Sequence, residues 1–351
     1  MANMVYKYFI TNNIIYNSSE ACDDMKYVLV GGIGYLGVNL AEELIRRGYK
    51  VIVVGRRGSE AKRRVIAEYI RNLGVDIRLY DRVNYVRLAE QQGDAYIHIA
   101  GKITGKLEDF REAHVYLLDE GIRAARELGS RIVYVSSIGA IGEILGVKPG
   151  SIVYEEEKHL NDKPHRHNSY HELTKAEGEK LLVSRGVDVK GKWSIIRPGL
   201  IMGPWAYHIE WRRFIDLLKL RLAPRIGIGL PIVHVRDVSE VIAEAIEGRY
   251  DGLWLNTVSP YYPDMADLVS EGCRQLKRRC LRIPLGLIIK LSLYSLGYIT
   301  PRGSPLSLTI NLLRLRYRYA SRHLKREWRP IEVMVKDFLE WVKSIQVKSY
   351  S

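Results

Sequence analysis

The stretch MKYVLVGGIGYLG, residues 25–37, combines an apolar run with three regularly spaced glycines. The run at residues 26–30 predicts a buried β-strand, and the residues after the glycines have apolar side chains at helical spacing. Gly31, Gly34 and Gly37 stand in GxxGxxG spacing between the two. Glycines here allow a tight turn and close approach to a pyrophosphate, and the helix N-terminus favours phosphate charge. The stretch therefore predicts a turn that binds a dinucleotide.

Short apolar runs alternate with longer amphipathic segments along most of the chain. The runs that predict strands lie at residues 26–30, 50–54, 75–80, 95–100, 131–137 and 192–198. Fully apolar strands that alternate with helices are typical of a parallel sheet covered on both faces, because parallel neighbours need crossover connections. We therefore predict a Rossmann-type, doubly wound α/β fold.

The alternation weakens after Pro198, which indicates a second region. We expect three parts: residues 1–24 as a disordered extension, residues 25–202 plus 232–257 as the dinucleotide-binding domain, and residues 203–231 plus 258–351 as a smaller substrate-binding lobe. The first part has no apolar core followed by a cleavage site, so it is a poor signal peptide. The apolar run at 285–299 is shorter than the roughly 20 residues that span a bilayer.

The end of the second predicted strand carries Gly55, Arg56 and Arg57. A site that prefers NAD usually has an acidic side chain here, which accepts hydrogen bonds from the ribose hydroxyls. Two guanidinium groups would instead attract a ribose 2′-phosphate. We therefore expect NADP as the cofactor, with NAD as the alternative. A solvated loop is the other interpretation of the two arginines.

The chain is basic, with 54 Lys and Arg against 40 Asp and Glu and a formal net charge of +14. This charge favours anionic ligands such as nucleotides, phosphorylated metabolites, nucleic acid or acidic lipid. The basic run at 312–329 is open to three interpretations: a solvated face, a clamp for a diphosphate-bearing substrate, or a patch that contacts a membrane surface. No recognised nucleic-acid-binding module accompanies it, so we expect a small-molecule substrate and no nucleic acid.

The three cysteines are Cys22, Cys273 and Cys280, and they form no CxxC pair. They are too few for a disulfide framework, which favours a reducing compartment and a cytoplasmic location. A bridge between Cys273 and Cys280, as in proteins of thermophiles, is the alternative.

Further segments resemble one family. They are DAYIHIAG (94–101), RIVYVSSIGAIG (131–142), IIRPGLIMGP (195–204) and IVHVRDV (232–238). With the glycine turn, they resemble the extended short-chain dehydrogenases/reductases, the family of NAD(P)-dependent epimerases, dehydratases and 3β-hydroxysteroid-dehydrogenase-like reductases. The resemblance implies that the cofactor contacts Gly31, Gly34, Tyr35, Leu36, Gly37, Asp81, Ala100, Gly101, Lys175 and Pro198. It also implies that members often dimerise, so a homodimer is an expectation here.

The stretch SYHELTKAE, residues 169–177, aligns with the catalytic YxxxK segment of that family but departs from it. Lys175 matches the lysine, His171 stands in place of the tyrosine, and Tyr170 comes one residue early. The resemblance assigns the catalytic serine to Ser137. Two other departures are His114, where the family has an asparagine, and Ile141, where it has a tyrosine.

Ser169 and Glu172 form a capping-box pattern, which predicts that a helix begins near Tyr170. The spacing i, i+4 then places His171 and Lys175 on one helix face. A neighbouring ammonium disfavours the imidazolium, so His171 would be a better base than acid. Tyr170 points about 100° around the helix from His171. Its hydroxyl could take the place of the His171 side chain only if the first turn were frayed or contained a π-bulge. Three hypotheses stay open: His171 carries the proton, Tyr170 does, or the site performs no conventional chemistry.

Four histidines, His159, His165, His167 and His171, lie close together in the sequence and suggest a metal site as an alternative. No cysteine is near them, and we expect no metal. The resulting prediction is an NAD(P)-dependent epimerase/dehydratase or reductase that acts on a nucleotide-sugar or a hydrophobic hydroxyl or keto compound. The alternative is a dinucleotide-binding scaffold or redox sensor without conventional catalysis.

Overall fold

The computed structural model describes residues 25–58, 61–144, 146–148, 150–155, 169–286, 300–304, 307, 310 and 317–349. The expected extension at 1–24, most of the apolar run at 285–299, and His159, His165 and His167 lie outside these residues.

A seven-stranded parallel sheet forms the centre of the described part of the chain, with strand order β11-β7-β5-β4-β1-β2-β3. The strands are β1 (Lys26–Val30), β2 (Lys50–Arg56), β3 (Asp76–Tyr80), β4 (Ala95–His98), β5 (Arg131–Val135), β7 (Trp193–Pro198) and β11 (Leu253–Thr257). The first six confirm the predicted strands, and β11 has no counterpart among them. The order reverses between β1 and β4, where a doubly wound sheet binds its ligand. The predicted fold class is confirmed.

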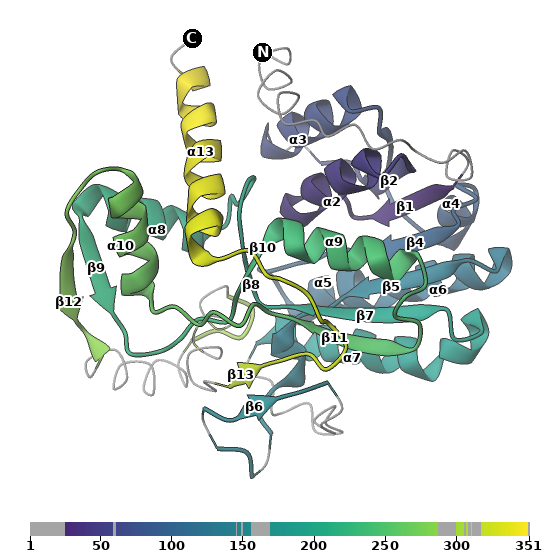
Figure 1. Cartoon of the computed structure of the whole chain (residues 1–351). Coiled ribbons are helices and arrows are strands. Elements are labelled where there is room, and N and C mark those ends of the chain that lie inside the picture. The colour runs from purple at the N-terminus through teal and green to yellow at the C-terminus, as the bar shows by residue number, and fades with distance from the viewer. Residues whose placement is uncertain are drawn as a thin grey trace.

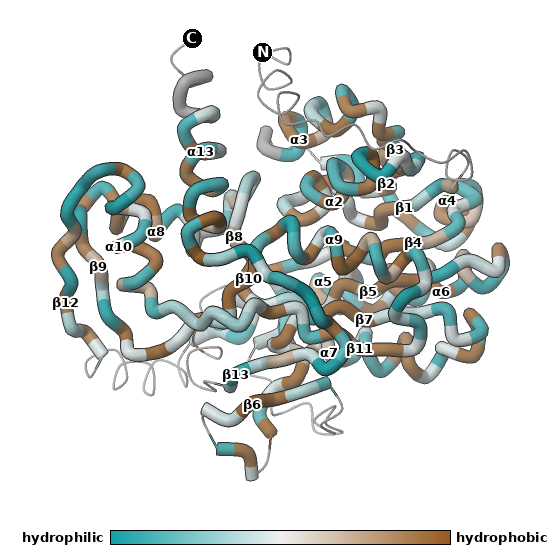
Figure 2. The backbone as a smooth tube through the Cα atoms, viewed as in Figure 1, coloured by the Kyte–Doolittle hydropathy of each residue, from teal (hydrophilic) through white to brown (hydrophobic). Residues whose placement is uncertain are grey.

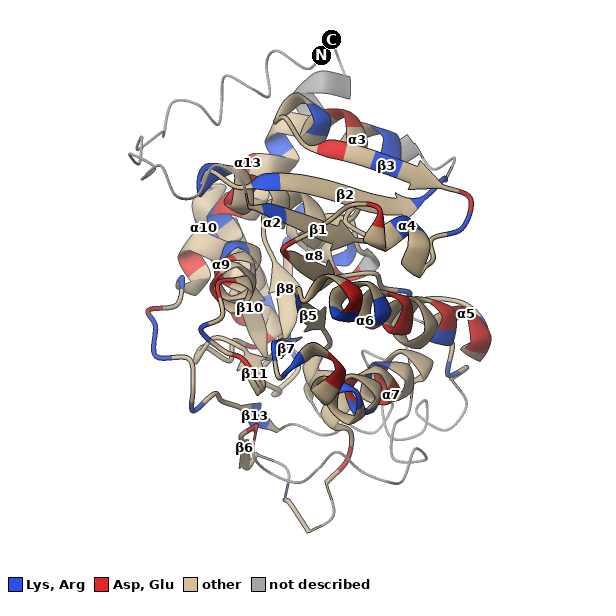
Figure 3. Ribbon diagram, turned by 90° about the vertical axis from the view of Figure 1, so that its right-hand side faces the viewer, with Lys and Arg blue, Asp and Glu red and all other residues tan. Residues whose placement is uncertain are grey.

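Helices cover both faces of the sheet because its strands are apolar on both sides (Figures 1 and 2). One face carries α2 (Tyr35–Arg46), α3 (Ala61–Asn72) and α9 (Val235–Ile246), and the other carries α4 (Tyr85–Ala89), α6 (Leu117–Leu128) and α7 (Tyr170–Ser184). Alternate residues of β1 point to opposite faces of the sheet. Tyr27 and Leu29 belong to the hydrophobic core on the side of α2, and Val28 and Val30 to the core on the side of α6. Figure 3 shows charges of both signs along α3, α6 and α7 and few on the strands.

A second group of elements extends to one side of the sheet (Figure 1). It comprises α8 (Ile209–Leu220), β9 (Leu222–Arg225), α10 (Met265–Gln275), β12 (Leu281–Pro284) and α13 (Ile331–Ser349). The short pairs β8 (Leu200–Met202) with β10 (Ile232–His234) and β6 (Ile152–Val153) with β13 (Arg318–Tyr319) complete the described strands. Cys273 and Cys280 form a disulfide in this group, as the alternative interpretation of the cysteines expected.

The described part of the basic run at 312–329 is bound to the rest of the protein. Arg326 and Arg329 form ion pairs with Glu240 of α9, and Arg329 also pairs with Asp237. Arg322 lies over the ring of Tyr154 at 4.5 Å. Arg326 and Arg329 therefore fasten the C-terminal segment to α9. None of the helices in the described ranges combines the length and apolar character that a bilayer crossing requires.

Candidate functional site

The glycine turn after β1 brings three backbone segments close together. Gly31 has φ of +84°, and a Cβ on it would lie 2.6 Å from the Cα of Ala100. A Cβ on Gly37 would lie 2.6 Å from the carbonyl carbon of Gly32. At Gly34, the N-cap of α2, a Cβ would meet no atom within 4 Å. The first and third glycines are thus required by packing, while the second leaves space beside the helix N-terminus, as a phosphate-binding turn needs.

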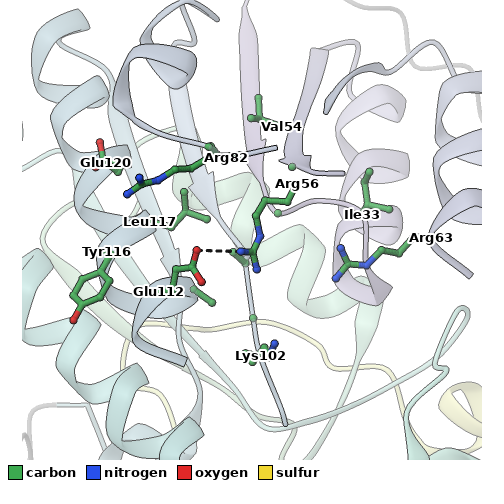
Figure 4. Close-up of a pocket in the computed structure, with 16 residues that line it drawn as sticks. Ile33, Val54, Arg56, Arg63, Arg82, Lys102, Glu112, Tyr116, Leu117 and Glu120 are labelled. Atoms are coloured by element: carbon green, nitrogen blue, oxygen red, sulfur yellow. Dashed lines mark hydrogen bonds and ion pairs between the residues drawn. The ribbon is translucent and has the colours of Figure 1, made fainter. Parts of the chain in front are cut away.

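A cavity of about 210 Å³ opens at the carboxyl ends of β1, β2 and β4, which is the point where the strand order reverses (Figure 4). Its lining includes Gly31, Ile33, Val54, Gly55, Arg56, Arg63, Arg82, Val83, Ala100, Gly101, Lys102, Glu112, Leu117 and Glu120. Four basic and two acidic side chains therefore line this space, which gives the predicted nucleotide position an excess of positive charge. This charge and the glycine turn fit a dinucleotide with its phosphates.

Arg56 and Arg57, both predicted to bind the cofactor, differ in their position relative to the cavity. Arg56 lines the cavity, and its Nη1 is 3.0 Å from the Oε1 of Glu112 (Figure 4). Arg57 is not among the lining residues; its Nε lies 3.5 Å from the Oδ1 of Asp81. The Asp81 side chain is 93% exposed, and the residues after it, Arg82 and Val83, line the cavity instead.

Most of the other predicted cofactor residues lie in the lining of this cavity or in the first turn of α2. Gly31, Ala100 and Gly101 line the cavity, Gly34 caps α2, and Tyr35, Leu36 and Gly37 form its first turn. Pro198 ends β7. The lining residues Arg63, Arg82 and Glu112 were not expected from the sequence. Arg63 lies on α3 and Glu112 on the segment before α6, and only the fold brings them to the end of β2.

The helix α7 begins at Tyr170, as the capping-box pattern predicted. The Oγ of Ser169 accepts a hydrogen bond from the N–H of Glu172 at 3.2 Å, and the Glu172 carboxylate accepts one from the N–H of Ser169 at 3.2 Å. The N-terminus of α7 is therefore capped by two reciprocal hydrogen bonds, and its first turn is not frayed. The π-helical turn of this region lies elsewhere, at Glu112–Tyr116.

Tyr170 and His171 consequently face different neighbours. The ring of Tyr170 lies 6.1 Å from that of Phe110 and 5.5 Å from the guanidinium of Arg302, and its N–H donates to the Arg302 carbonyl at 3.0 Å. The ring of His171 lies 5.3 Å from that of His114, edge to face. Tyr170 thus packs against the C-terminal part of the chain, and His171 packs against the segment before α6.

His114 has one protonation state that satisfies all of its hydrogen bonds. Its Nε2 accepts from the N–H of Lys102 at 3.0 Å, so Nδ1 must carry the proton and donate to the Oγ1 of Thr174 at 2.7 Å. Thr174 Oγ1 in turn donates to the carbonyl of Tyr170 at 2.7 Å. Burial, and then the charge of Lys175, hold the pKa of His114 well below its ordinary value. His114 is therefore a neutral residue that ties α7 to the Lys102 loop.

His171 is also neutral. Burial, followed by the charges of Lys175 and His208, lowers the pKa of His171 to about 3. Its Nδ1 is buried and makes no hydrogen bond to the described residues. A neutral imidazole can accept a proton through the lone pair of one ring nitrogen. Near neutral pH it has no acidic proton to donate.

Lys175 points inward, toward the ends of β4 and β5. Its Nζ donates to the carbonyl of Val135 at 2.6 Å and lies 3.5 Å from the carbonyl of Ala100, which lines the cavity. Burial lowers the pKa of Lys175 to about 7, although the Glu179 carboxylate opposes the shift. Ser137 follows β5 and caps a short 3₁₀ turn, where its Oγ accepts from the N–H of Gly139 at 3.1 Å.

No group of three or more His, Cys, Asp or Glu side chains within the described ranges could hold a metal ion.

Comparison with known proteins defines the class. Residues 27–252 match the NAD dependent epimerase/dehydratase family, and the chain therefore belongs to this family, whose members are generally enzymes. It is 29% identical over 226 residues to sterol demethylase protein B of Methylococcus capsulatus, and 27% identical over 234 residues to the chloroplast stem-loop binding protein of 41 kDa b of Arabidopsis thaliana. These alignments cover 62% and 63% of this chain, and 64% and 54% of the two relatives.

Solved structures share the fold over nearly the whole chain. The crystal structure of gox2253 superposes with a TM-score of 0.70 at 20% identity, covering 92% of this chain and 98% of the other. MoeE5 in complex with UDP-glucuronic acid and NAD superposes with a TM-score of 0.65 at 17% identity, covering 91% and 99%. At these identities the likeness concerns the fold alone.

Proposed function

We propose that the protein binds a nicotinamide dinucleotide, with a preference for NADP, and is an oxidoreductase or epimerase acting on a hydroxyl or keto substrate. The observation that carries the proposal is the cavity at the β1/β4 reversal, whose lining includes Gly31, Arg56, Arg63 and Arg82. Lys175 lies next to this cavity, because its Nζ is 3.5 Å from the carbonyl of the lining residue Ala100. The basic lining would hold the phosphates, including a ribose 2′-phosphate. When bound, the dinucleotide would supply a hydride acceptor or donor.

His171 is the group we assign to proton transfer. It lies one helical turn before Lys175, in the position of the family's tyrosine, and it is neutral. In the oxidation of an alcohol, a neutral imidazole would take the hydroxyl proton while the substrate carbon loses its hydride. Lys175 would hold the ribose, and Ser137 would bind the substrate oxygen.

Two substrate classes follow from the relatives' names. A hydrophobic hydroxyl compound is supported by the sterol demethylase relative, and a nucleotide-sugar by the complex of MoeE5 with UDP-glucuronic acid and NAD. Both contain secondary alcohols that one base and one hydride acceptor could oxidise.

A second candidate function is dinucleotide binding without turnover. It is favoured by the position of Tyr170, whose ring lies between Phe110 and Arg302, and by the lack of a hydrogen bond to His171 Nδ1 from the described residues. In that case the dinucleotide would bind and keep its oxidation state.

Replacing the proposed base separates these functions. We expect His171→Gln to lower kcat for alcohol oxidation by about 100-fold or more, because acid–base groups contribute roughly 10²- to 10⁴-fold. The Kd for NADPH should stay unchanged. His171 stays neutral down to about pH 3, so a step near pH 7 in the pH profile of the wild-type rate would belong to Lys175, whose pKa burial lowers to about 7. The measurement is NADP reduction, followed by absorbance, with sterol-like alcohols and with UDP-sugars.

Tyr170→Phe tests the other assignment. Full activity in this variant together with loss in His171→Gln supports His171 as the base. Loss of activity in Tyr170→Phe alone would transfer the role to Tyr170. Dinucleotide binding without any change of oxidation state would support the second candidate.

A further inference from the structure

Arg56 and Glu112, which both line the cavity, form an ion pair. Arg56 is the last residue of β2, and Glu112 is the first residue of the π-helical turn before α6. The two side chains therefore reach the cavity from different elements (Figure 4). Arg56 Nη1 and Glu112 Oε1 are 3.0 Å apart, and both side chains line the cavity and are about half exposed. The pair is therefore in the path of a ligand and accessible to it.

The other carboxylate in the cavity lining is engaged elsewhere. Glu120 Oε2 accepts a hydrogen bond from the N–H of Tyr85 at 2.7 Å, at the beginning of α4. Glu112 makes its described ion pair with Arg56. Within this lining, Glu112 is the carboxylate placed to compete with an anionic ligand for Arg56.

A guanidinium binds a carboxylate and a phosphate through the same N–H groups. The Glu112 carboxylate, which contacts Arg56 Nη1, would therefore compete with the 2′-phosphate of NADP for this guanidinium. NAD has an uncharged hydroxyl at that position and offers Arg56 no replacement for Glu112.

We propose that Glu112 is a specificity-determining residue whose carboxylate takes the place of the 2′-phosphate on Arg56. With NAD or NADH bound, the Arg56–Glu112 pair stays closed and Arg56 keeps a partner. With NADP or NADPH bound, the 2′-phosphate displaces Glu112. The residue therefore moderates the preference for NADP and lets the site accept both cofactors. This inference rests on the proposed function, because it requires that a dinucleotide binds in this cavity.

The test is a double-mutant cycle in the full chain. The Kd values for NADPH and NADH are measured by nicotinamide fluorescence for wild type, Glu112→Gln, Arg56→Gln and the double variant. An exposed ion pair corresponds to a factor of about two to five, so Glu112→Gln should tighten NADPH by that factor and leave NADH unchanged. Arg56→Gln should weaken NADPH by about ten-fold, since hydrogen bonds between charged groups are strong. The double variant should match Arg56→Gln.

Glu127→Gln is the matched control. Glu127 is exposed, lies on α6 and is not among the cavity residues. Its variant makes the same change of net charge away from the cavity. It should leave the NADPH/NADH ratio of Kd values unchanged. Equal effects of Glu112→Gln on both cofactors, or an effect that persists without Arg56, would overturn the inference while the proposed function stands. Wild-type protein that binds neither cofactor would overturn both.

Discussion

Gly37→Ala is expected to lower the free energy of unfolding by on the order of 3 kcal/mol and to abolish dinucleotide binding. The new Cβ would enter the carbonyl group of Gly32, with 2.6 Å to its carbon. The obstacle is backbone, so no change of rotamer relieves it, and α2 must move away from the turn. The loss of stability is measured by urea unfolding, and the loss of binding by nicotinamide fluorescence.

Gly34→Ala supplies the comparison within the same motif. Its backbone is extended, with φ of −161°, and a Cβ there meets no atom within 4 Å. We expect a cost below about 1 kcal/mol, mainly from replacing glycine as the N-cap. Equal destabilisation by the two substitutions would show that α2 does not pack on the turn as described.

Arg197→Met is expected to destabilise the protein by about 3–5 kcal/mol, because it leaves a buried carboxylate without its partner. Arg197 of β7 binds Glu179 of α7 through two hydrogen bonds, of 2.9 Å and 2.6 Å, and both side chains are 0% exposed. This pair joins the sheet to the helix that carries His171 and Lys175. Thermal and urea unfolding would measure the effect.

Two variants identify burial as the cause. Replacing both partners, Arg197→Met with Glu179→Leu, should restore much of the stability, since neither member of the pair is left charged without the other. Arg111→Met removes a similar two-bond pair with Glu177 on the same helix, but that pair is partly exposed. It should cost less than about 1 kcal/mol. A large loss in Arg111→Met, or no recovery in the double variant, would contradict this account.

The central fold could be predicted because its strands are short apolar runs and its first turn depends on local glycine chemistry. The strand β11 (Leu253–Thr257) could not be predicted in this way. Its residues Leu253 and Trp254 are only partly buried, and the strand exists because it pairs with β7, which is distant in the sequence. Pairing of that kind is set by the tertiary structure and leaves little local signal.

The site could be predicted in part. The sequence locates Arg56 and Arg57 at the end of β2, but neighbouring residues of an extended chain point to opposite sides, and only Arg56 lines the cavity. Arg63, Arg82 and Glu112 come from other elements, so their approach depends on how helices cover the sheet. The π-helical turn that begins at Glu112 gives no sequence signal, although such turns often occur at functional sites.

The described residues around Lys175 show why a histidine at position 171 can be accommodated there. His98, His114 and His171 all have pKa values lowered first by burial and then by the charge of Lys175, so they remain neutral beside Lys175. A site with this charge balance can hold a base next to Lys175 without placing two buried cations together.

The most direct test of the central claim is an equilibrium titration of the wild-type protein with NADPH, followed by nicotinamide fluorescence. We predict saturable binding of one NADPH per chain, with a Kd that rises in Arg56→Gln because this guanidinium lines the cavity. Absence of saturable binding, or binding that is unchanged in Arg56→Gln and in Gly37→Ala, would contradict the assignment of this cavity to a dinucleotide.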